Sequence, residues 1–308
     1  MSARAAIAQK EWRIASRDSV LLVMAILFLI MSVASVYIGS STKSAELKAY
    51  EDIVQLAQQQ GAAPPNAPRI FPLEILANIV DYIVMIGAVL AIFLGYNAFH
   101  AERVNGTLRI LLSHPLTQKD VVAGKLLGAA GIIGVLLAVT FAFNLLLFML
   151  MAKLVPTVEE AARLGLCLMM AFIYMMMFYS AALWVSLKAQ EGTYAFLLMM
   201  IVWIFVSFVI PQLSDAQRNY AYAISNLSGM VTKMPSETAA SHLISLFSPA
   251  VQFTDLGNAF LQADADDASL GLGMLLTKQA STILYLLVCD LLLLFVLFHS
   301  AKRKEILE

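Results

Sequence analysis

The sequence HAERVNGTLRILLSHPLTQKDVVAGK occupies residues 100–125 and separates two long apolar segments of the chain. Most of its charged side chains are basic: Arg103, Arg109, Lys119 and Lys125, against Glu102 and Asp120. Loops on the cytoplasmic side of a membrane carry such an excess of lysine and arginine. We therefore expect a cytoplasmic loop between two membrane spans, which either binds a soluble partner or is a plain basic connector.

This loop has the local signals of a helix, a stop and a second helix. Residues 102–113 contain good helix formers at most positions, with Asn105-Gly106 as a weak point, and three leucines share one face. The Ser-His-Pro sequence that follows ends this helix, because the residue before a proline is pushed out of the helical region. Thr117 and Asp120 have the spacing of an N-cap and an acidic N3 residue, which opens the next helix. We expect a short amphipathic helix at the cytoplasmic membrane face.

The composition is that of a polytopic membrane protein. Of the 308 residues, 60% are hydrophobic and only 13% are charged. The mean hydropathy of +0.80 is too high for an ordinary soluble domain. The two cysteines, Cys167 and Cys289, lie inside apolar segments, so neither a disulfide framework nor a metal site is expected. The predicted fold class is an all-α polytopic membrane protein with one domain over residues 1–308.

Six apolar segments have about the 20 residues that a helix needs to cross a bilayer. They are residues 19–37, 75–99, 126–150, 164–187, 193–210 and 281–298. The first is expected to be an uncleaved span and not a secretory signal, because a long basic region precedes it and further spans follow. Pro211 is expected to end the fifth span.

Six spans with residues 100–125 inside place both termini in the cytoplasm and residues 38–74 and 212–277 outside. The first outer segment is predicted to begin with a helix over residues 42–60. The basic residues concentrate on the inner side, in agreement with this orientation. They are Arg4, Lys10, Arg13, Arg17, Arg103, Arg109, Lys119, Lys125, Lys188, Lys302, Arg303 and Lys304.

Residues 1–18 are predicted to form an interfacial helix. Its basic side chains share one arc of a helical wheel: Lys10, Arg13 and Arg17. Trp12 lies on the opposite, alanine-rich arc, which Glu11 interrupts. Such a helix has a tryptophan anchor and basic residues that face anionic headgroups. The alternative is a disordered basic tail.

Small residues at the start of the third span form a stripe that would let another helix approach closely. These residues are Gly124, Gly128, Gly131 and Gly134. The alternative is an incidental excess of glycine. The methionine-rich fourth span is expected to pack in the core and not to bind a soft metal.

The outer segment 212–277 is predicted to be a small helical cap, with helix starts at Ser236 and at Ser248-Pro249. Its three neighbouring aspartates lack the glycine and distal glutamate of a calcium loop, so a solvated turn is expected: Asp264, Asp266 and Asp267.

Sequence motifs argue against an enzyme. The chain has no GxxxxGK[ST] phosphate loop, no HExxH, no GxSxG and no CxxC. Asp290 is the one acid deep within a span, where it either relays protons or contacts substrate, or is a neutral acid at a helix interface. Asp81 lies near the outer end of the second span, close enough to water for a structural role.

The loop resembles that of the permease subunits of ABC transporters of the ABC-2 type. The resemblance lies in Glu102, Asn105-Gly106-Thr107-Leu108, Leu111-Leu112-Ser113, Pro115-Leu116-Thr117, Val121 or Val122, and Gly124-Lys125. The order of an interfacial helix, six spans and a large outer segment before the sixth is similar too. Among these permeases the chain looks nearest to the branch that matures nitrous oxide reductase and other copper enzymes.

The resemblance implies that two six-span subunits, as a homodimer or pseudodimer, dock onto separate ATPase subunits that bind ATP and magnesium. Residues 102–113 would be the coupling helix, with contacts from Glu102, Arg103, Asn105, Gly106, Thr107, Leu108, Arg109 and Leu112. Residues 4–17 would be the elbow helix, with Lys10, Trp12 and Arg13. No cofactor in this chain and no nucleic acid are implied, and the remaining partners are membrane lipid and an accessory protein outside the cytoplasm.

Three hypotheses stay open at this point. The first is the permease of an ATP-driven exporter, whose cargo the sequence does not choose among lipids, hydrophobic drugs and sulfur compounds. The second is an ABC complex whose outer segment drives an extracytoplasmic partner without passing cargo, because the outer region is larger than in lipid and polysaccharide exporters. The third is a proton-coupled secondary transporter centred on Asp290.

Overall fold

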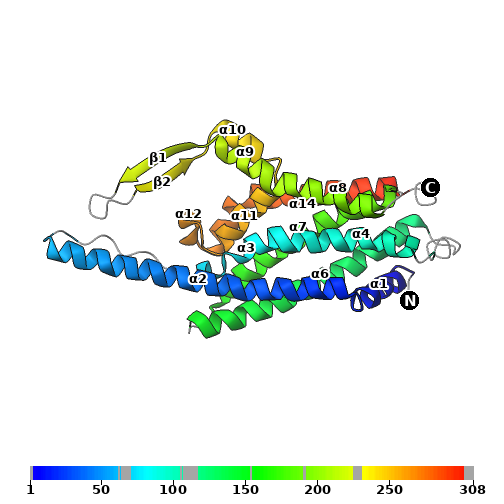
Figure 1. The fold of residues 1–308 in the computed structure, drawn as a ribbon, viewed down its shortest axis with the longest axis horizontal. Helices are drawn as coiled ribbons and strands as arrows, with labels where there is room; N and C mark the ends of the chain where they lie inside the picture. Colours follow the sequence, from blue (N-terminus) through cyan, green and yellow to red (C-terminus); the bar gives the residue numbers. More distant parts are fainter. Residues whose placement is uncertain are drawn as a thin grey trace.

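The computed structural model describes residues 3–61, 63, 71–104, 106, 117–152, 155–189, 192–224 and 231–301. These residues form an elongated bundle of helices with a two-stranded hairpin at one end (Figure 1). The first helix and the end of the last helix lie together at the other end of the bundle. We call this end the terminal end, and the end with the hairpin the distal end.

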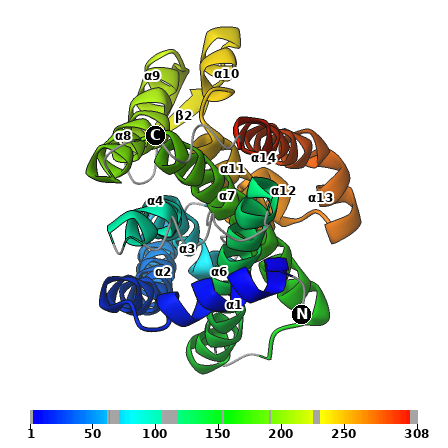
Figure 2. The same ribbon diagram turned by 90° about the vertical axis from the view of Figure 1, so that its right-hand side faces the viewer.

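Six helical segments in the described part of the chain are long and apolar enough to cross a membrane, which confirms the predicted fold class. They are Ser19–Gln59, Pro72–Val104, Gln118–Leu150, Val158–Lys188, Gly192–Ala216 and Ala280–Ser300. A short helix, α1 (Ala3–Ala15), precedes them and crosses the terminal end of the bundle (Figure 2). The N-terminal segment is therefore a helix and not a disordered tail.

The fourth span, α7 (Val158–Lys188), is the centre of the bundle. Within its most apolar window 72% of the residues are buried, against 11% in the last span, α14 (Ala280–Ser300). The methionines at its middle belong to the buried core, as expected: Met170, Met175, Met176 and Met177. Its N-terminus is fixed by a capping box between Thr157 and Glu160, so the helix begins before the predicted span.

The first span continues as one helix, α2 (Ser19–Gln59), and the predicted break after residue 37 is wrong. Its 41 residues make a rod of about 60 Å, twice the hydrocarbon thickness of a bilayer. The predicted break lies where the apolar run of the sequence ends, next to Gly39. In the structure this glycine lies against the 3-10 helix η1 (Pro72–Leu76), and a Cβ at this position would lie 2.2 Å from the carbonyl oxygen of Ile75. The glycine therefore serves close packing and not a turn.

The second span starts with η1 and continues through a π-helical turn into a regular helix. Its remaining parts are α3 (Ile79–Tyr82), η2 (Ile83–Gly87) and α4 (Ala88–Val104). The fifth span has the same construction, with α8 (Gly192–Ile204), η3 (Phe205–Val209) and α9 (Ile210–Ala216). Pro211 lies inside α9, so the predicted end of this span is wrong. The π-helical turn of η3 rearranges the backbone hydrogen bonds immediately before the proline, and the helix passes it without ending.

The third span, α6 (Gln118–Ala152), begins as predicted. The backbone N–H of Asp120 donates to the Thr117 hydroxyl at 3.3 Å, which confirms the expected N-cap. The helix thus starts at its predicted cap, before the predicted membrane span, and its first turns lie against α1.

The segment before the last span is a helical cap only in part. It contains an antiparallel hairpin of β1 (Asn219–Ile224) and β2 (Val231–Ser236), in register from Asn219 opposite Ser236 to Ile224 opposite Val231. The alternation of tyrosine with alanine in the sequence NYAYAI is the strand signal that the helical prediction overlooked. The predicted start at Ser248-Pro249 is confirmed, and the one at Ser236 lies three residues early. The helices of this segment are α10 (Ala239–Ser245), α11 (Pro249–Phe260), α12 (Ala265–Ala268) and α13 (Leu272–Lys278).

The prediction of a solvated turn at the three aspartates is wrong for Asp267. This side chain is 1% exposed, pairs with Lys278 and accepts a hydrogen bond from the Gln279 amide at 2.8 Å. Sequence spacing gave no sign of this pairing, because the two partners of Asp267 lie at the C-terminal end of α13, which follows in the chain.

Replacement of Gly39 by leucine tests whether α2 needs the close contact with η1. Because the side chain would collide with the backbone of Ile75, we expect a loss of about 1–3 kcal/mol in the free energy of unfolding. The measurement is the thermal unfolding midpoint of the purified protein in detergent.

Gly273→Ala is the matched control, since a Cβ there meets open space. Equal midpoints for both variants would show that the Gly39 contact contributes nothing to stability.

Candidate functional site

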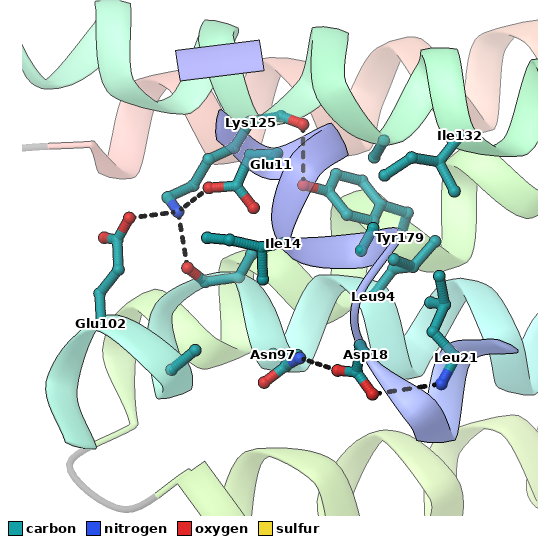
Figure 3. Close-up of a pocket in the computed structure, with 14 residues that line it drawn as sticks. Glu11, Ile14, Asp18, Leu21, Leu94, Asn97, Glu102, Lys125, Ile132 and Tyr179 are labelled. Atoms are coloured by element: carbon teal, nitrogen blue, oxygen red, sulfur yellow. Dashed lines mark hydrogen bonds and ion pairs between the residues drawn. The ribbon is translucent and has the colours of Figure 1, made fainter. Parts of the chain in front are cut away.

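The described residues that flank the loop of residues 105–116 come together at the terminal end. The loop leaves the end of α4 and returns to the start of α6; α1 packs against α6, and its Lys10 pairs with Glu102 of α4. Figure 3 shows the side chains of these helices around Lys125. Glu102 on α4 is 3% exposed and Lys125 on α6 is 0% exposed. Both ends of the loop thus carry a buried charge.

Lys125 is surrounded by acceptors. Its Nζ lies 2.7 Å from Glu11 Oε1, 3.0 Å from Glu102 Oε1 and 2.6 Å from the carbonyl oxygen of Ala98 (Figure 3). An ammonium group has three N–H donors, and here each has a partner. The charge also lies over the ring of Phe99, 5.0 Å from its centroid. Burial of a charge is costly unless it is paired in this way.

Glu102 is shared by two lysines. Lys10 on α1 places its Nζ 2.7 Å from the same Oε1 that faces Lys125. Two lysines and two glutamates therefore balance, with Lys10 and Glu11 from α1, Glu102 from α4 and Lys125 from α6. We call these four residues the ion cluster. It ties α1 to both ends of the loop.

The glycine stripe of α6 allows this close approach. A Cβ on Gly124 would lie 2.7 Å from Cβ of Ile7, and one on Gly128 would lie 2.7 Å from Cβ of Glu11. A Cβ on Gly131 would lie 3.7 Å from the Trp12 ring, in ordinary van der Waals contact. The predicted close approach of another helix thus takes place, and the helix is α1.

The corner between α1 and α2 is fixed by Asp18. Its Oδ1 accepts hydrogen bonds from the backbone N–H groups of Val20 at 2.9 Å and Leu21 at 3.3 Å, which caps α2. The Asn97 amide on α4 donates to its Oδ2 at 2.9 Å (Figure 3). Asp120 at the start of α6 forms a more exposed pair with Arg4 at 2.7 Å.

Contacts from α7 complete the base of the loop. The Tyr179 hydroxyl donates to the carbonyl oxygen of Lys125 at 3.1 Å. Arg103, next to Glu102, donates to the carbonyl oxygen of Leu187 at 3.2 Å and also to that of Ala189. These bonds cap the end of α7, whose last carbonyls have no helical partner.

Gly106 marks the end of α4. Its φ of +67° is the left-handed conformation that favours glycine, and its N–H donates to the Arg103 carbonyl at 3.1 Å. Glu102 and Arg103 therefore belong to α4, and not to a separate helix over residues 102–113. The other predicted contacts with a partner lie outside the described residues: Asn105, Thr107, Leu108, Arg109 and Leu112.

Sequence reasoning named Lys10, Trp12 and Arg13 on α1 as elbow residues but missed Glu11, Asp18, Asn97 and the pairing of Lys125. Lys10 belongs to the ion cluster, whereas the side chain of Arg13 is exposed. A signal for Glu11 existed, because an acid on the apolar side of an amphipathic helix needs a partner.

A cleft of about 450 Å³ opens at the distal end between the two π-helical turns. It is lined by Asp81, Asp215 and Asp255 together with Arg218. Arg218 pairs with Asp215 at 3.2 Å, while Asp81 is exposed; the structural role predicted for Asp81 stays a prediction. Desolvation within the cleft raises the pKa of Asp255 to about 6, and the charge of Arg218 opposes this rise.

Asp290 is half-buried on the peripheral helix α14. Among the described residues no hydrogen-bond partner faces its Oδ1. The structure places it away from the ion cluster and outside the lining of the distal cleft. Both roles predicted for Asp290 therefore stay predictions.

The comparison with protein families decides the class of the molecule. The family described as ABC-2 family transporter protein matches residues 5–305. The chain belongs to this family. It is the permease component of an ABC transporter and a multi-pass membrane protein. A comparison with curated proteins found no match.

ABC-2 permeases generally have no ATPase site of their own and imply an ABC ATPase partner. This membership favours the ATP-driven hypotheses over a proton-coupled transporter centred on Asp290. The match covers the family as a whole, and the copper-enzyme maturation branch stays a prediction.

Lys125→Met tests the ion cluster. The change leaves two glutamates facing one lysine, and breaking a buried pair in this way is expected to cost about 3–5 kcal/mol of unfolding free energy. Adding Glu11→Gln restores a neutral pair of Lys10 and Glu102, so the double variant should be more stable than Lys125→Met alone. Thermal unfolding in detergent measures both.

Arg4→Gln is the control, because it breaks a solvent-exposed pair at the same helix and should leave the midpoint unchanged. A double variant that is less stable than Lys125→Met would contradict the charge balance proposed for the cluster.

Proposed function

We propose that this permease converts ATP hydrolysis by a separate ATPase subunit into movement of its spans, and that the ion cluster is the mechanical link. The observation that carries the proposal is the fully buried Lys125, which joins the ends of the 105–116 loop to α1. A force applied to the loop reaches α1, α4 and α6 together, because separating them would expose unpaired buried charges.

The orientation follows from the distribution of charge. The terminal end carries basic residues on α1, on both sides of the loop and at the end of α7, and membrane proteins keep such residues in the cytoplasm. We therefore place the terminal end inside, where the ATPase subunit is found, and the distal end outside. Arg103 and the capped end of α7 support the loop from the other side.

The working unit in this proposal is a homodimer of permeases with two ATPase subunits that bind ATP and magnesium. ATP closes the ATPase dimer, the two loops approach each other, and the bundle changes between two arrangements. The ATPase subunit shifts the permease between these arrangements because it binds the loop with a different affinity in each of them.

Glu102→Lys and Gly106→Pro test this proposal in the complex with the ATPase subunit. Glu102→Lys turns a balanced cluster into three lysines and one glutamate, and Gly106→Pro forbids the positive φ that ends α4. We expect permease-dependent ATP turnover to fall by about fivefold or more, the lower range of coupling between two sites. Turnover and retention of the ATPase subunit are measured on the purified complex.

Gly273→Ala serves as the control because it lies in open space on α13. Unchanged ATPase retention and unchanged turnover in both loop variants would reject the proposal.

A second candidate role is favoured by the distal end. The outer half of α2 and the hairpin of β1 and β2 project on the same side of the bundle, away from the spans (Figure 1). Such projections suit a permease that drives a partner outside the membrane. Helix α11, later in the same segment, is part of the core through Phe253, Leu256 and Phe260, all 0% exposed, so the hairpin is better placed than α11 to contact a partner.

A photoreactive amino acid at Tyr220 tests this second role. The side chain is 37% exposed on β1, and we expect it to crosslink in cells to one extracytoplasmic protein, identified by mass spectrometry. The crosslink should disappear when the ATPase subunit is inactivated, because the contact depends on the driven arrangement. Leu284 on the exposed face of α14 is the control position. A crosslinking pattern identical at both positions would speak against a dedicated partner.

A further inference from the structure

An apolar groove runs down the outside of the bundle beneath α1. Its lining consists of Trp12, Ala15, Ser16, Leu21, Ala25, Leu29, Leu90, Ile132, Val135, Leu136 and Val139, around a volume of about 250 Å³. Except for Ser16 next to α1, every one of these side chains is hydrophobic. The groove lies beside the pocket that holds the ion cluster, because Ala15, Leu21 and Ile132 line both, but no residue of the ion cluster lines the groove.

Two helical stripes form the walls. On α2 the lining residues recur every four positions, and on α6 they recur at i, i+3, i+4 and i+7, so that each set lies on one face. Leu90 of α4, 1% exposed, is the floor. The roof is formed by Trp12 of α1 and by Ser16 just after this helix, where the groove meets the expected membrane surface.

The groove has the depth of one leaflet. From Leu21 to Leu29 the wall of α2 extends by about 12 Å, and half of a typical hydrocarbon core is about 15 Å. Deeper in the bundle the two walls meet, because the Asn144 amide on α6 donates to the Ser32 hydroxyl on α2 at 3.1 Å. The groove therefore ends where a single acyl chain would end.

The roof offers cationic and polar donors to a headgroup. Arg13 and Arg17 follow Trp12 and Ser16 in the chain, and both arginine side chains are exposed. In the described part of the chain neither forms an ion pair, and the Trp12 indole N–H donates no hydrogen bond. Guanidinium groups match phosphate geometry, and interfacial tryptophan and arginine are residues of membrane surfaces.

We propose that this groove is a binding site for one anionic phospholipid. One acyl chain lies between α2 and α6, and Arg13, Arg17 and the Trp12 indole hold the phosphate. The cationic roof and the apolar walls below it follow the same order as the charged headgroup and the acyl chain of a lipid. If a second copy of the chain covered this groove with its own groove face, its Arg13 and Arg17 would lie near the same two arginines and repel them. An anionic lipid attracts them, so charge complementarity favours the lipid. The site does not depend on the proposed function.

The test is lipid retention by the delipidated full-length protein in detergent, measured by native mass spectrometry with added phosphatidylglycerol or phosphatidylcholine. We expect one phosphatidylglycerol to be retained per chain, at least about tenfold better than phosphatidylcholine, because each arginine near a headgroup favours the anionic lipid. Arg13→Gln with Arg17→Gln should bring the two lipids to within about twofold of each other.

Val135→Trp fills the groove from α6 and should reduce retention of both lipids at least about tenfold, the effect of losing an acyl-chain contact. If this variant does not fold, Val139→Trp one turn deeper replaces it. The controls are Lys188→Gln, which removes a charge at the end of α7, and Leu292→Trp, which enlarges an exposed side chain of α14. Both should retain phosphatidylglycerol as the unchanged protein does.

Equal retention of the two lipids by the unchanged protein would overturn the proposal. A preference for phosphatidylglycerol that persists after both arginines are replaced would also overturn it. The same holds if the two controls lose lipid retention as the groove variants do, since either result means general lipid contact. If Val135→Trp dissociates a dimer while lipid retention stays the same, the groove is a contact between copies of the chain, and the proposal fails.

Discussion

A buried ammonium group has to be neutralised where it stands, and the arrangement of the terminal end follows from this constraint. Lys125 is wholly inaccessible, and its partners come from two helices that are far apart in the sequence. Glu102 must therefore stay at the end of α4 and Glu11 on the inner side of α1. Gly124 and Gly128 of α6 are required for the same reason, because a larger side chain at either position would hold α1 too far away for the pairing. Neutralisation of Lys125 and the close approach of α1 to α6 therefore require each other. Together they fix the positions of the helix ends, on α4 and α6, between which the loop of this ABC-2 permease runs.

Local signals in the sequence were sufficient for the parts of the fold that local chemistry determines. The six apolar segments, the helix of residues 3–15, the Thr117 cap and the start at Pro249 could all be predicted from composition, capping residues and the position of a proline. The failures have different causes. The end of the apolar run near Gly39 looks like a helix end, but α2 continues because it packs on η1 there, and a single sequence does not display such tertiary contacts. Pro211 also looks like a helix end, but a local π-helical turn accommodates it, and the hairpin of β1 and β2 had a local signal that was overlooked.

The sequence could predict where the candidate site lies in the chain, but not which side chains contact each other in it. The basic loop pointed to residues 100–125, and its resemblance to other permeases pointed to the same place. The partners of Lys125 lie 23 and 114 positions away, so no spacing rule could have joined them. The two π-helical turns are a similar case. They are distant in sequence, yet both line the distal cleft with its three aspartates, which places the irregular backbone of two spans around one polar space.

The unbroken length of α2 has a mechanical consequence. Gly39 touches η1 near the middle of the helix, about 30 Å from each of its ends. A stiff rod held at its midpoint is a lever with equal arms. The end of α2 at the terminal end is joined through Asp18 and Asn97 to the helix that leads into the loop. A tilt of about 5° about the midpoint would move each end by about 2–3 Å in opposite directions, over arms of about 30 Å. A rod of this kind would transmit a displacement at the terminal end to the distal end.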